Sequence, residues 1–384
     1  MTTRRIRLGM VGGGQGAFIG AVHRIAARMD DHYELVAGAL SSDPKRALAS
    51  GQELGLEADR IYPDFREMAK AEARRADGIE AVAIVTPNHL HYPAAKAFIE
   101  AGIHVICDKP MTLDLKEARA LAALLAERKD QIFALTHNYS GYPMVRQARA
   151  MVLAGELGAI RLVEGEYPQD WLTTPLERSG QKQAAWRTDP ARTGAGGCVG
   201  DIGTHTYQLA CFVSGLRVEE LAADLTSFVP GRRVDDNVHV LLRFEGGARG
   251  MIWASQVAPG NENGLRLRIY GTKGGLAWAQ EDPNYLWFTP FGQPKRLITR
   301  GGAGSAGGAA RVTRVPPGHP EGYLEGFANI YAEVARAIQA KRAGRKPDPE
   351  VEFPGIADGL AGMAFIEACV KSSARNARWT KLSG

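Results

Sequence analysis

The chain has 384 residues, of which 45% are hydrophobic and 23% charged, a composition typical of a globular protein with two or three domains. The net charge is +5 and no Lys/Arg run exceeds two residues, which argues against a nucleic-acid-binding protein. The four cysteines form no CxxC pair and no apolar run approaches the ~18–20 residues of a membrane span, so we expect neither a metal site nor a transmembrane segment. The N-terminus also lacks the apolar segment of a signal peptide, which favours a cytoplasmic location.

Strands and helices alternate in the first third of the chain. The expected strands are Ile6–Val11, Leu35–Leu40, Ala81–Val85, His104–Cys107 and Ile132–Thr136. The expected helices are Ala17–Met29, Lys45–Leu54, Phe65–Ala76, Pro93–Ala101 and Leu115–Arg128. Short, wholly apolar strands separated by helices indicate a parallel sheet buried on both faces. Residues 1–137 are therefore predicted to form a doubly wound α/β domain of the Rossmann type.

The remainder of the chain has a different pattern. Helices are expected at Met144–Ala154, Gly200–Val213, Phe327–Ala340 and Ile356–Ser373. Six strand-like runs are Ile160–Tyr167, Glu219–Phe228, Val238–Phe244, Gly250–Gln256, Leu265–Tyr270 and Gly275–Ala279. Consecutive strands without helices between them favour a large, mostly antiparallel sheet in an α+β domain. We assign residues 138–384 to this second domain, with the option that its C-terminal helix packs back on the first.

A glycine-rich turn follows the first strand, with the sequence Gly12-Gly13-Gly14-Gln15-Gly16 and then Gly20. Glycines at this place let the backbone approach a pyrophosphate at a helix N-terminus. We therefore predict that Gly12, Gly14, Gln15 and Gly16 contact a dinucleotide. Because position 17 is Ala, the loop is longer than the common pattern, and Gly20 is expected to be the glycine that packs helix on strand.

The end of the second strand bears on the choice between NAD and NADP. Ser41, Ser42 and Arg46 stand where NAD enzymes usually carry an acidic residue for the ribose. Hydroxyl and cationic groups suit a 2′-phosphate, which favours NADP slightly. The alternative is that Ser-Asp43-Pro only caps a helix, and Asp43 keeps NAD open.

Two further segments carry chemistry. Asp108 and Lys109 follow a buried parallel strand, at the edge of the sheet where ligands bind in open α/β folds. Asp201 and His205 are four residues apart, so a helix places them on one face. A carboxylate beside an imidazole can orient it for proton exchange with a hydroxyl. The alternatives are a solvated lysine in a turn and a structural Asp–His pair.

These pieces together resemble the glucose–fructose oxidoreductase / inositol dehydrogenase / rhizopine catabolism (Gfo/Idh/MocA) oxidoreductases. The resemblance covers nearly the whole chain. The matching segments are the glycine turn with trailing His23, Thr86-Pro87-Asn88-x-x-His91, residues 101–110 ending in Asp108-Lys109-Pro110, and Gly-Gly-x-x-x-Asp201-x-x-x-His205.

The resemblance implies Lys109, Asp201 and His205 as the catalytic group. It implies that Thr86, Pro87, Asn88 and His91 line the nicotinamide side of the cofactor site, together with Asp108 and Lys109. Asp108 is one methylene shorter than the glutamate that the family usually has. Relatives often have a cis lysine–proline bond and an open-faced sheet that forms homodimers or homotetramers, and we expect a homo-oligomer here.

Substrate-binding candidates lie in the irregular segments of the second domain. Tyr139, Lys182, Trp186 and Arg187 combine aromatic faces with hydrogen-bonding groups, as sugar sites do. Lys182 and Arg187 would also suit a carboxylate or phosphate on an acidic sugar. The competing interpretation is that these side chains only pack in a structured loop.

The resulting hypothesis is an NAD- or NADP-dependent dehydrogenase that moves hydride between nicotinamide and a hydroxyl-bearing carbon of a sugar or cyclic polyol. One alternative is redox-assisted cleavage of a glycoside with recycled NAD. The other is a regulatory protein that binds NAD(P) and catalyses nothing.

Overall fold

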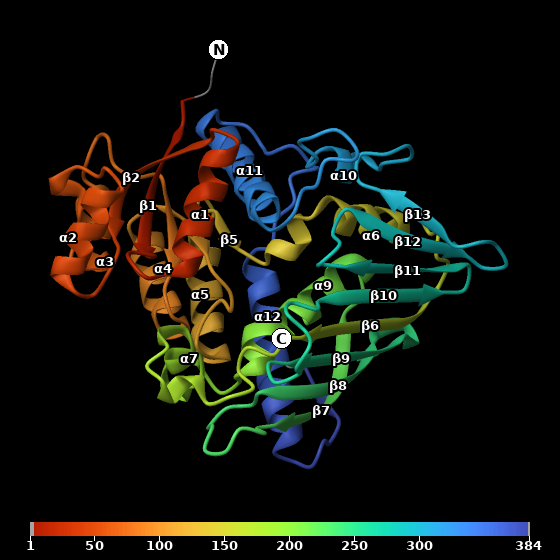
Figure 1. Ribbon diagram of the computed structural model, residues 1–384. Helices are drawn as coiled ribbons and strands as arrows, with labels where there is room; N and C mark the ends of the chain where they lie inside the picture. The colour runs from red at the N-terminus through yellow and green to blue at the C-terminus, as the bar shows by residue number, and fades with distance from the viewer. Residues whose placement is uncertain (1–3, 383–384) are drawn as a thin grey trace. The chain divides into compact units, whose positions relative to one another are not determined.

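The structure is a computed structural model that describes residues 4–382 (Figure 1). The chain forms two compact units. The first comprises Met1–Asn138 and Tyr323–Leu360, and the second Tyr139–Gly322 and Ala361–Gly384.

The first unit contains a five-stranded sheet in the order β2-β1-β3-β4-β5, with every pair parallel. Its strands are β1 (Ile6–Gly12), β2 (Tyr33–Ala39), β3 (Ala81–Val85), β4 (His104–Cys107) and β5 (Phe133–Leu135). The helices between them are α1 (Phe18–Met29), α2 (Pro44–Glu53), α3 (Phe65–Glu72), α4 (His91–Glu100) and α5 (Leu115–Glu127). The predicted parallel α/β domain is confirmed.

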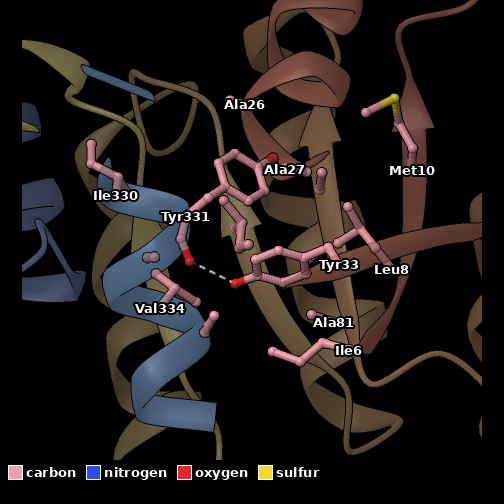
Figure 2. Packing of buried hydrophobic residues seen from close by; sticks show 14 of the residues in the cluster. Ile6, Leu8, Met10, Ala26, Ala27, Tyr33, Ala81, Ile330, Tyr331 and Val334 are labelled. Atoms are coloured by element: carbon pink, nitrogen blue, oxygen red, sulfur yellow. Dashed lines mark hydrogen bonds between the residues drawn. The ribbon is translucent and has the colours of Figure 1, made fainter. Parts of the chain in front are cut away.

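Both faces of this sheet are covered, as its apolar strands require. Leu8 and Met10 of β1 belong to a core shared with α1 and α11 (Tyr323–Arg342). Figure 2 shows this packing, in which the Tyr33 hydroxyl donates to the carbonyl of Tyr331 at 2.9 Å. Gly9, between Leu8 and Met10, faces the other side, where an added Cβ would meet Met68 of α3 at 2.3 Å.

The course of residues 323–360 differs from the predicted boundary at 137/138. That boundary assigned Tyr323–Leu360 to the second domain, but the segment belongs to the first unit. The physical reason is the apolar side of α11, from Phe327 to Ile338, which fills the core over β1, β2 and β3. The helix α12 (Ile356–Ser373) begins in the first unit and continues into the second.

The second unit is built on a nine-stranded sheet in the order β13-β12-β11-β10-β6-β9-β8-β7-β14. The strands are β6 (Ile160–Pro168), β7 (Val218–Thr226), β8 (Asn237–Phe244), β9 (Arg249–Ser255), β10 (Arg266–Gly271), β11 (Gly274–Ala279), β12 (Tyr285–Pro290), β13 (Arg296–Thr299) and β14 (Thr380–Lys381). All neighbours are antiparallel except β6 and β9. The helices α6 (Pro143–Leu153) and α9 (Thr204–Ser214) pack on one face of this sheet, as Figure 1 shows.

Sequence analysis missed several elements of this unit. Strands β12, β13 and β14 were not predicted, nor were the short helices α7 (Lys182–Arg187), α8 (Pro190–Thr193) and α10 (Gly307–Ala310). The helix expected from Gly200 begins as a π-helical turn, Val199–Gly203, and becomes α-helical at Thr204. Short 3₁₀ turns occur at Ala58–Arg60, Asn88–Leu90, Asn138–Gly141, Leu176–Arg178 and Glu245–Gly247.

Residues 4–382 contain neither a helix suited to span a membrane nor a cluster of metal ligands. None of their helices combines the length and apolarity that a bilayer crossing requires. Their His, Cys, Asp and Glu side chains do not gather into any group of three or more that could hold a metal ion.

Candidate active site

The glycine turn after β1 has the backbone that a phosphate-binding loop needs. Gly12, Gly13 and Gly16 have φ angles of +79°, +74° and +76°, which favour glycine over any other residue. A Cβ on Gly14 would lie 2.7 Å from the carbonyl oxygen of Leu40, so this residue also has to be glycine. A Cβ on Gly20 would lie 2.4 Å from the Cα of Gly13, which confirms Gly20 as the packing glycine.

The turn leads into the N-terminus of α1. Hydrogen bonds from Gly14 N to Leu40 O (3.2 Å) and from Gln15 N to Ser50 Oγ (3.1 Å) fix it to the connection between β2 and α2. The space beside Gly16 is open, because no atom lies within 4 Å of an ideal Cβ there. A shaped backbone beside open space at a helix N-terminus is a suitable cradle for a pyrophosphate.

The segment after β2 uses its acidic residue as a helix cap. Asp43 Oδ1 accepts the N–H of Arg46 at 2.8 Å, and Asp43 N donates to Ser41 Oγ at 3.1 Å. The side chains of Ser42, Lys45 and Arg46 are exposed. The helix cap that sequence analysis kept as an alternative is therefore present. The side chains of Ser42, Lys45 and Arg46 remain exposed near the end of β2.

The connection after β3 carries Thr86, Pro87, Asn88 and His91. The Thr86 hydroxyl is buried and, among the residues described, has no hydrogen-bond partner. The His91 ring is buried between two backbone carbonyls, with Nδ1 at 2.6 Å from Pro110 O and Nε2 at 2.8 Å from Thr86 O. His91 therefore joins the loops that follow the adjacent strands β3 and β4.

The loop after β4 holds Asp108 and Lys109 before a cis Lys109–Pro110 bond. Asp108 Oδ1 accepts the Thr136 hydroxyl at 3.0 Å and the backbone N–H of Lys109 at 2.9 Å. The short carboxylate thus binds its own loop and the end of β5. Sequence analysis did not identify Thr136 as its partner.

Buried histidines surround this acidic group. Burial lowers the pKa of His23 to about 4, and burial together with the positive charge of Lys109 lowers the pKa of His137 to about 3. Burial also lowers the pKa of His91, while the negative charge of Asp108 acts in the opposite direction on all three rings. The low pKa values of His23 and His137 mean that these two rings are neutral at pH 7.

In the second unit, the carboxylate of Asp201 has two donors on one oxygen. Its Oδ2 accepts Gln256 Nε2 at 2.9 Å and Arg187 Nε at 3.2 Å. Asp201 lies in the π-helical turn and His205 in the first turn of α9. π-helical turns inside helices often occur at functional sites.

The ring of His205 lies against two tyrosines. Its centroid is 4.9 Å from that of Tyr139, which it meets edge to face, and 6.3 Å from that of Tyr167. Tyr139 is buried, its hydroxyl lies 2.5 Å from that of Tyr167, and Tyr167 donates to Asn263 Oδ1 at 2.7 Å. Gln169 Nε2 donates to the same amide oxygen at 2.8 Å. Uncharged hydroxyls and amides thus form a hydrogen-bonded chain near His205.

The other predicted substrate residues lie on α7. Lys182 is exposed at its first turn. Trp186 donates to Gln183 Oε1 at 3.2 Å and packs under the guanidinium of Arg187, whose Cζ is 4.3 Å from the ring centroid. Arg187 also donates to Gln183 Oε1. Of the four candidates, Tyr139 contacts His205 and Arg187 contacts Asp201.

Sequence analysis did not identify Gln256, Asn263 or Tyr167. Gln256 follows the end of β9 and Asn263 precedes β10, so both reach this region through loops. Position at the end of a strand was the signal available for Gln256, but it does not distinguish this residue from other polar residues in loops.

A parallel sheet with a glycine cradle, and a second unit with histidine and carboxylate on one helix, define a class of protein: a nicotinamide-dependent oxidoreductase. Comparison with known proteins identifies the family. The family model described as "Oxidoreductase family, NAD-binding Rossmann fold" matches residues 6–137. The family model described as "GFO/IDH/MocA C-terminal domain" matches residues 145–277. The chain belongs to the Gfo/Idh/MocA oxidoreductase family.

Relatives cover almost the full length of the chain. An oxidoreductase from Sinorhizobium meliloti is 63% identical, with a TM-score of 0.90 over 99% of this chain and 100% of that one. An inositol dehydrogenase homolog from Azotobacter vinelandii, solved with NAD+, is 37% identical, with a TM-score of 0.95 over 99% and 98%. The uncharacterized oxidoreductase YfiI of Bacillus subtilis is 38% identical over 99% of this chain and 97% of its own.

These comparisons confirm the predicted family, the fold class and the class of enzyme, a nicotinamide-dependent dehydrogenase. The roles of the individual site residues stay predictions.

Proposed function

We propose that this protein oxidises a hydroxyl-bearing carbon of a neutral cyclic polyol or sugar. The observation that carries the proposal is the position of His205 beside Tyr139 and the chain of hydroxyls and amides that continues to Asn263. Such groups recognise hydroxyls, since each can donate or accept a hydrogen bond. The relatives support this substrate class: one structure of the Azotobacter homolog contains NADH and myo-inositol, and a levoglucosan dehydrogenase 26% identical contains NADH and levoglucosan.

The residues of the first unit fit a nicotinamide dinucleotide. Gly12, Gly14, Gln15 and Gly16 would hold the pyrophosphate, because their backbone approaches closely and the space at Gly16 is open. The buried Thr86 hydroxyl supplies a hydrogen-bonding group on the nicotinamide side, next to Pro87 and Asn88. When bound, the cofactor supplies the hydride acceptor.

We assign the catalytic role in removing the proton of the substrate hydroxyl to the group Lys109, Asp201 and His205. His205 or Lys109 exchanges that proton with the substrate. Asp201 stabilises the imidazolium that results, because a carboxylate favours a nearby positive charge. A neutral substrate is favoured because the guanidinium of Arg187 already forms an ion pair with the carboxylate of Asp201.

For the cofactor, we propose that the chain takes NAD and also accepts NADP. Asp43 is engaged as the cap of α2, and Lys45 and Arg46 are exposed beside it. A 2′-phosphate at this place would meet the exposed cations Lys45 and Arg46 and the hydroxyl of Ser42, with Asp43 as the one opposing charge among these four residues.

We further propose that the protein forms a homo-oligomer through the outer face of the nine-stranded sheet. Exposed apolar side chains lie opposite one another on this face: Leu241 with Met251, Leu162 with Tyr270, and Trp287 with Leu297. Their exposed fractions run from 38% to 56%, which is unusual for six large apolar side chains on one sheet face. Light scattering of the purified protein tests this proposal, and a monomer would reject it.

The test of the activity is a screen of purified protein against inositols, anhydro sugars, hexoses, pentoses and sugar acids, with NAD and NADP separately. Reduced nicotinamide is followed by its absorbance. Turnover of a neutral polyol that is lost in Lys109→Ala, with cofactor binding retained, supports the proposal. Preference for a sugar acid would reject the neutral substrate class. Cofactor binding without turnover of any compound would favour a regulatory protein, and release of an aglycone without net reduction would favour glycoside cleavage.

A further inference from the structure

The strongest unexplained feature of the second unit is a buried pair of carboxylates, Asp235 and Asp236, which precedes β8. Asp235 is 7% exposed and Asp236 is fully buried. Buried carboxylates are costly unless they are bonded, so their partners indicate what the pair does for the fold.

Asp235 binds the segment that leads to Asp201. Its carboxylate accepts Gly197 N at 2.6 Å and Val199 N at 2.8 Å, and its carbonyl accepts Cys198 N at 2.8 Å. Three successive N–H groups at the start of the π-helical turn are thus held by one residue. Asp201 N in turn donates to Gly197 O at 2.9 Å.

Asp236 is linked to the carboxylate of Asp201 through Gln256. Its carbonyl accepts Gln256 N at 2.8 Å, and Gln256 Nε2 donates to Asp201 Oδ2 at 2.9 Å. The side chain of Asp236 accepts Phe228 N, Val229 N and Arg232 Nη1 at 2.9, 3.1 and 2.9 Å. Its charge is thus balanced within the core, while its backbone carries Gln256.

We infer that Asp235 is a positioning residue for the reaction: it fixes Asp201 through the turn Gly197–Val199, while its neighbour Asp236 fixes the Gln256 that hydrogen-bonds Asp201. This inference rests on the proposed role of Asp201. Close packing at the turn supports it, because a Cβ on Gly197 would lie 2.3 Å from Asp235 O. Burial raises the pKa of Asp235 to about 6, although the N–H groups of Gly197 and Val199 lower it. Keeping this carboxylate ionised in the core therefore costs free energy.

The test uses Asp235→Asn, with the exposed Asp224→Asn on β7 as its matched control. An amide offers one acceptor oxygen where the carboxylate offers two, so one of the two N–H groups loses its partner. With NAD and the best polyol of the screen, we expect kcat to fall by about tenfold or more, with the KM values changed by less than about threefold, because Asp235 acts only through Asp201.

A double-mutant cycle separates this role from a merely structural one. In an Asp201→Asn background, the further change Asp235→Asn should lower kcat by less than about twofold, since the group that it positions is already altered. Multiplicative losses, or a folded Asp235→Asn protein with wild-type kcat, would overturn the inference.

A second variant disturbs the same contact from the opposite side. Gly197→Ala should mimic Asp235→Asn, whereas Gly200→Ala, whose Cβ would have only Ile366 Cδ1 near it at 3.9 Å, should not. Amide hydrogen exchange over residues 196–203 provides a readout without turnover. Exchange at Gly197 and Val199 should be about tenfold faster in Asp235→Asn and unchanged in Asp224→Asn.

The exchange measurement also distinguishes the two ways of failing. If no polyol is oxidised but exchange rises as expected, the proposed function is rejected while the anchoring of the turn stands. If a polyol is oxidised and neither kcat nor exchange responds to Asp235→Asn, the positioning inference is rejected and the function stands.

Discussion

Arg187 Nε lies 3.2 Å from Asp201 Oδ2, and the same guanidinium covers the ring of Trp186. The planar guanidinium makes both contacts together with a bond to Gln183, a combination that a lysine ammonium cannot reproduce. Arg187 therefore belongs to the support of Asp201 as much as to any substrate contact.

The first prediction concerns Arg187→Lys. Loss of one hydrogen bond to a charged group corresponds to about 1.5–3 kcal/mol, so kcat should fall by roughly tenfold to a hundredfold. Steady-state kinetics on a neutral polyol measures it, with Arg192→Lys as the control. A rise in KM with unchanged kcat would show instead that Arg187 acts by binding substrate.

The second prediction concerns the approach of α1 to β1. Gly20→Ala would place a Cβ 2.4 Å from Gly13 Cα and 2.6 Å from Gly13 O. Because both obstacles are backbone, we expect a loss of about 1–3 kcal/mol in the free energy of unfolding and weaker NAD binding. Denaturant unfolding and a cofactor titration check this. Gly307→Ala, where no atom lies within 4 Å of the new Cβ, is the control, and equal effects of the two changes would contradict the steric argument.

How far the sequence determines these features depends on the range of the interactions. The first-unit strands and the glycine turn were predictable, because apolar runs and glycine spacing are local signals. The helical segment that carries Asp201 and His205 was predictable from its local pattern, whereas the catalytic roles of the two residues stay predictions that come from the family resemblance.

Long-range partners were not predictable. Asp235 meets Gly197 across 38 residues and Gln256 meets Asp201 across 55, and no local pattern encodes either contact. The prediction that α11 belongs to the second domain was wrong for a related reason. Its apolar side predicts burial, but residues 139–322 of the second unit stand between the first-unit strands and this helix in the sequence.

The third prediction is a dependence of stability on pH in the acidic range. His23 is fully buried and its pKa is lowered from 6.5 to about 4, so the unfolded chain binds a proton that the folded chain excludes. For a base with a lowered folded pKa, this stability is present above pH 6.5 and is lost as the pH falls towards 4. The shift corresponds to ~3 kcal/mol for this residue. His104, whose Nδ1 accepts Ile132 N at 3.2 Å, adds in the same direction.

Unfolding free energies at several pH values from 4 to 7.5 measure this effect. The slope should become smaller in His23→Phe, because the proton uptake by the unfolded chain is removed. An unchanged slope in that variant would mean that His23 is not the neutral buried group described here.

The last prediction concerns selection between the two cofactors. If the 2′-phosphate of NADP lies at the N-terminus of α2, Arg46→Ala should raise the KM for NADP by about tenfold, the value of one charge-assisted hydrogen bond, and leave the KM for NAD unchanged.

Asp43→Ala should act differently. It removes the cap on Arg46 N and should lower the free energy of unfolding by about 1 kcal/mol, and it should shift preference towards NADP because a carboxylate is removed from the site. Kinetics with both cofactors, together with denaturant unfolding, distinguish the two residues. Equal losses with NAD and NADP in Arg46→Ala would show that this arginine does not contact the 2′ position, and the exposed cations after β2 would then be only a solvated first turn of α2.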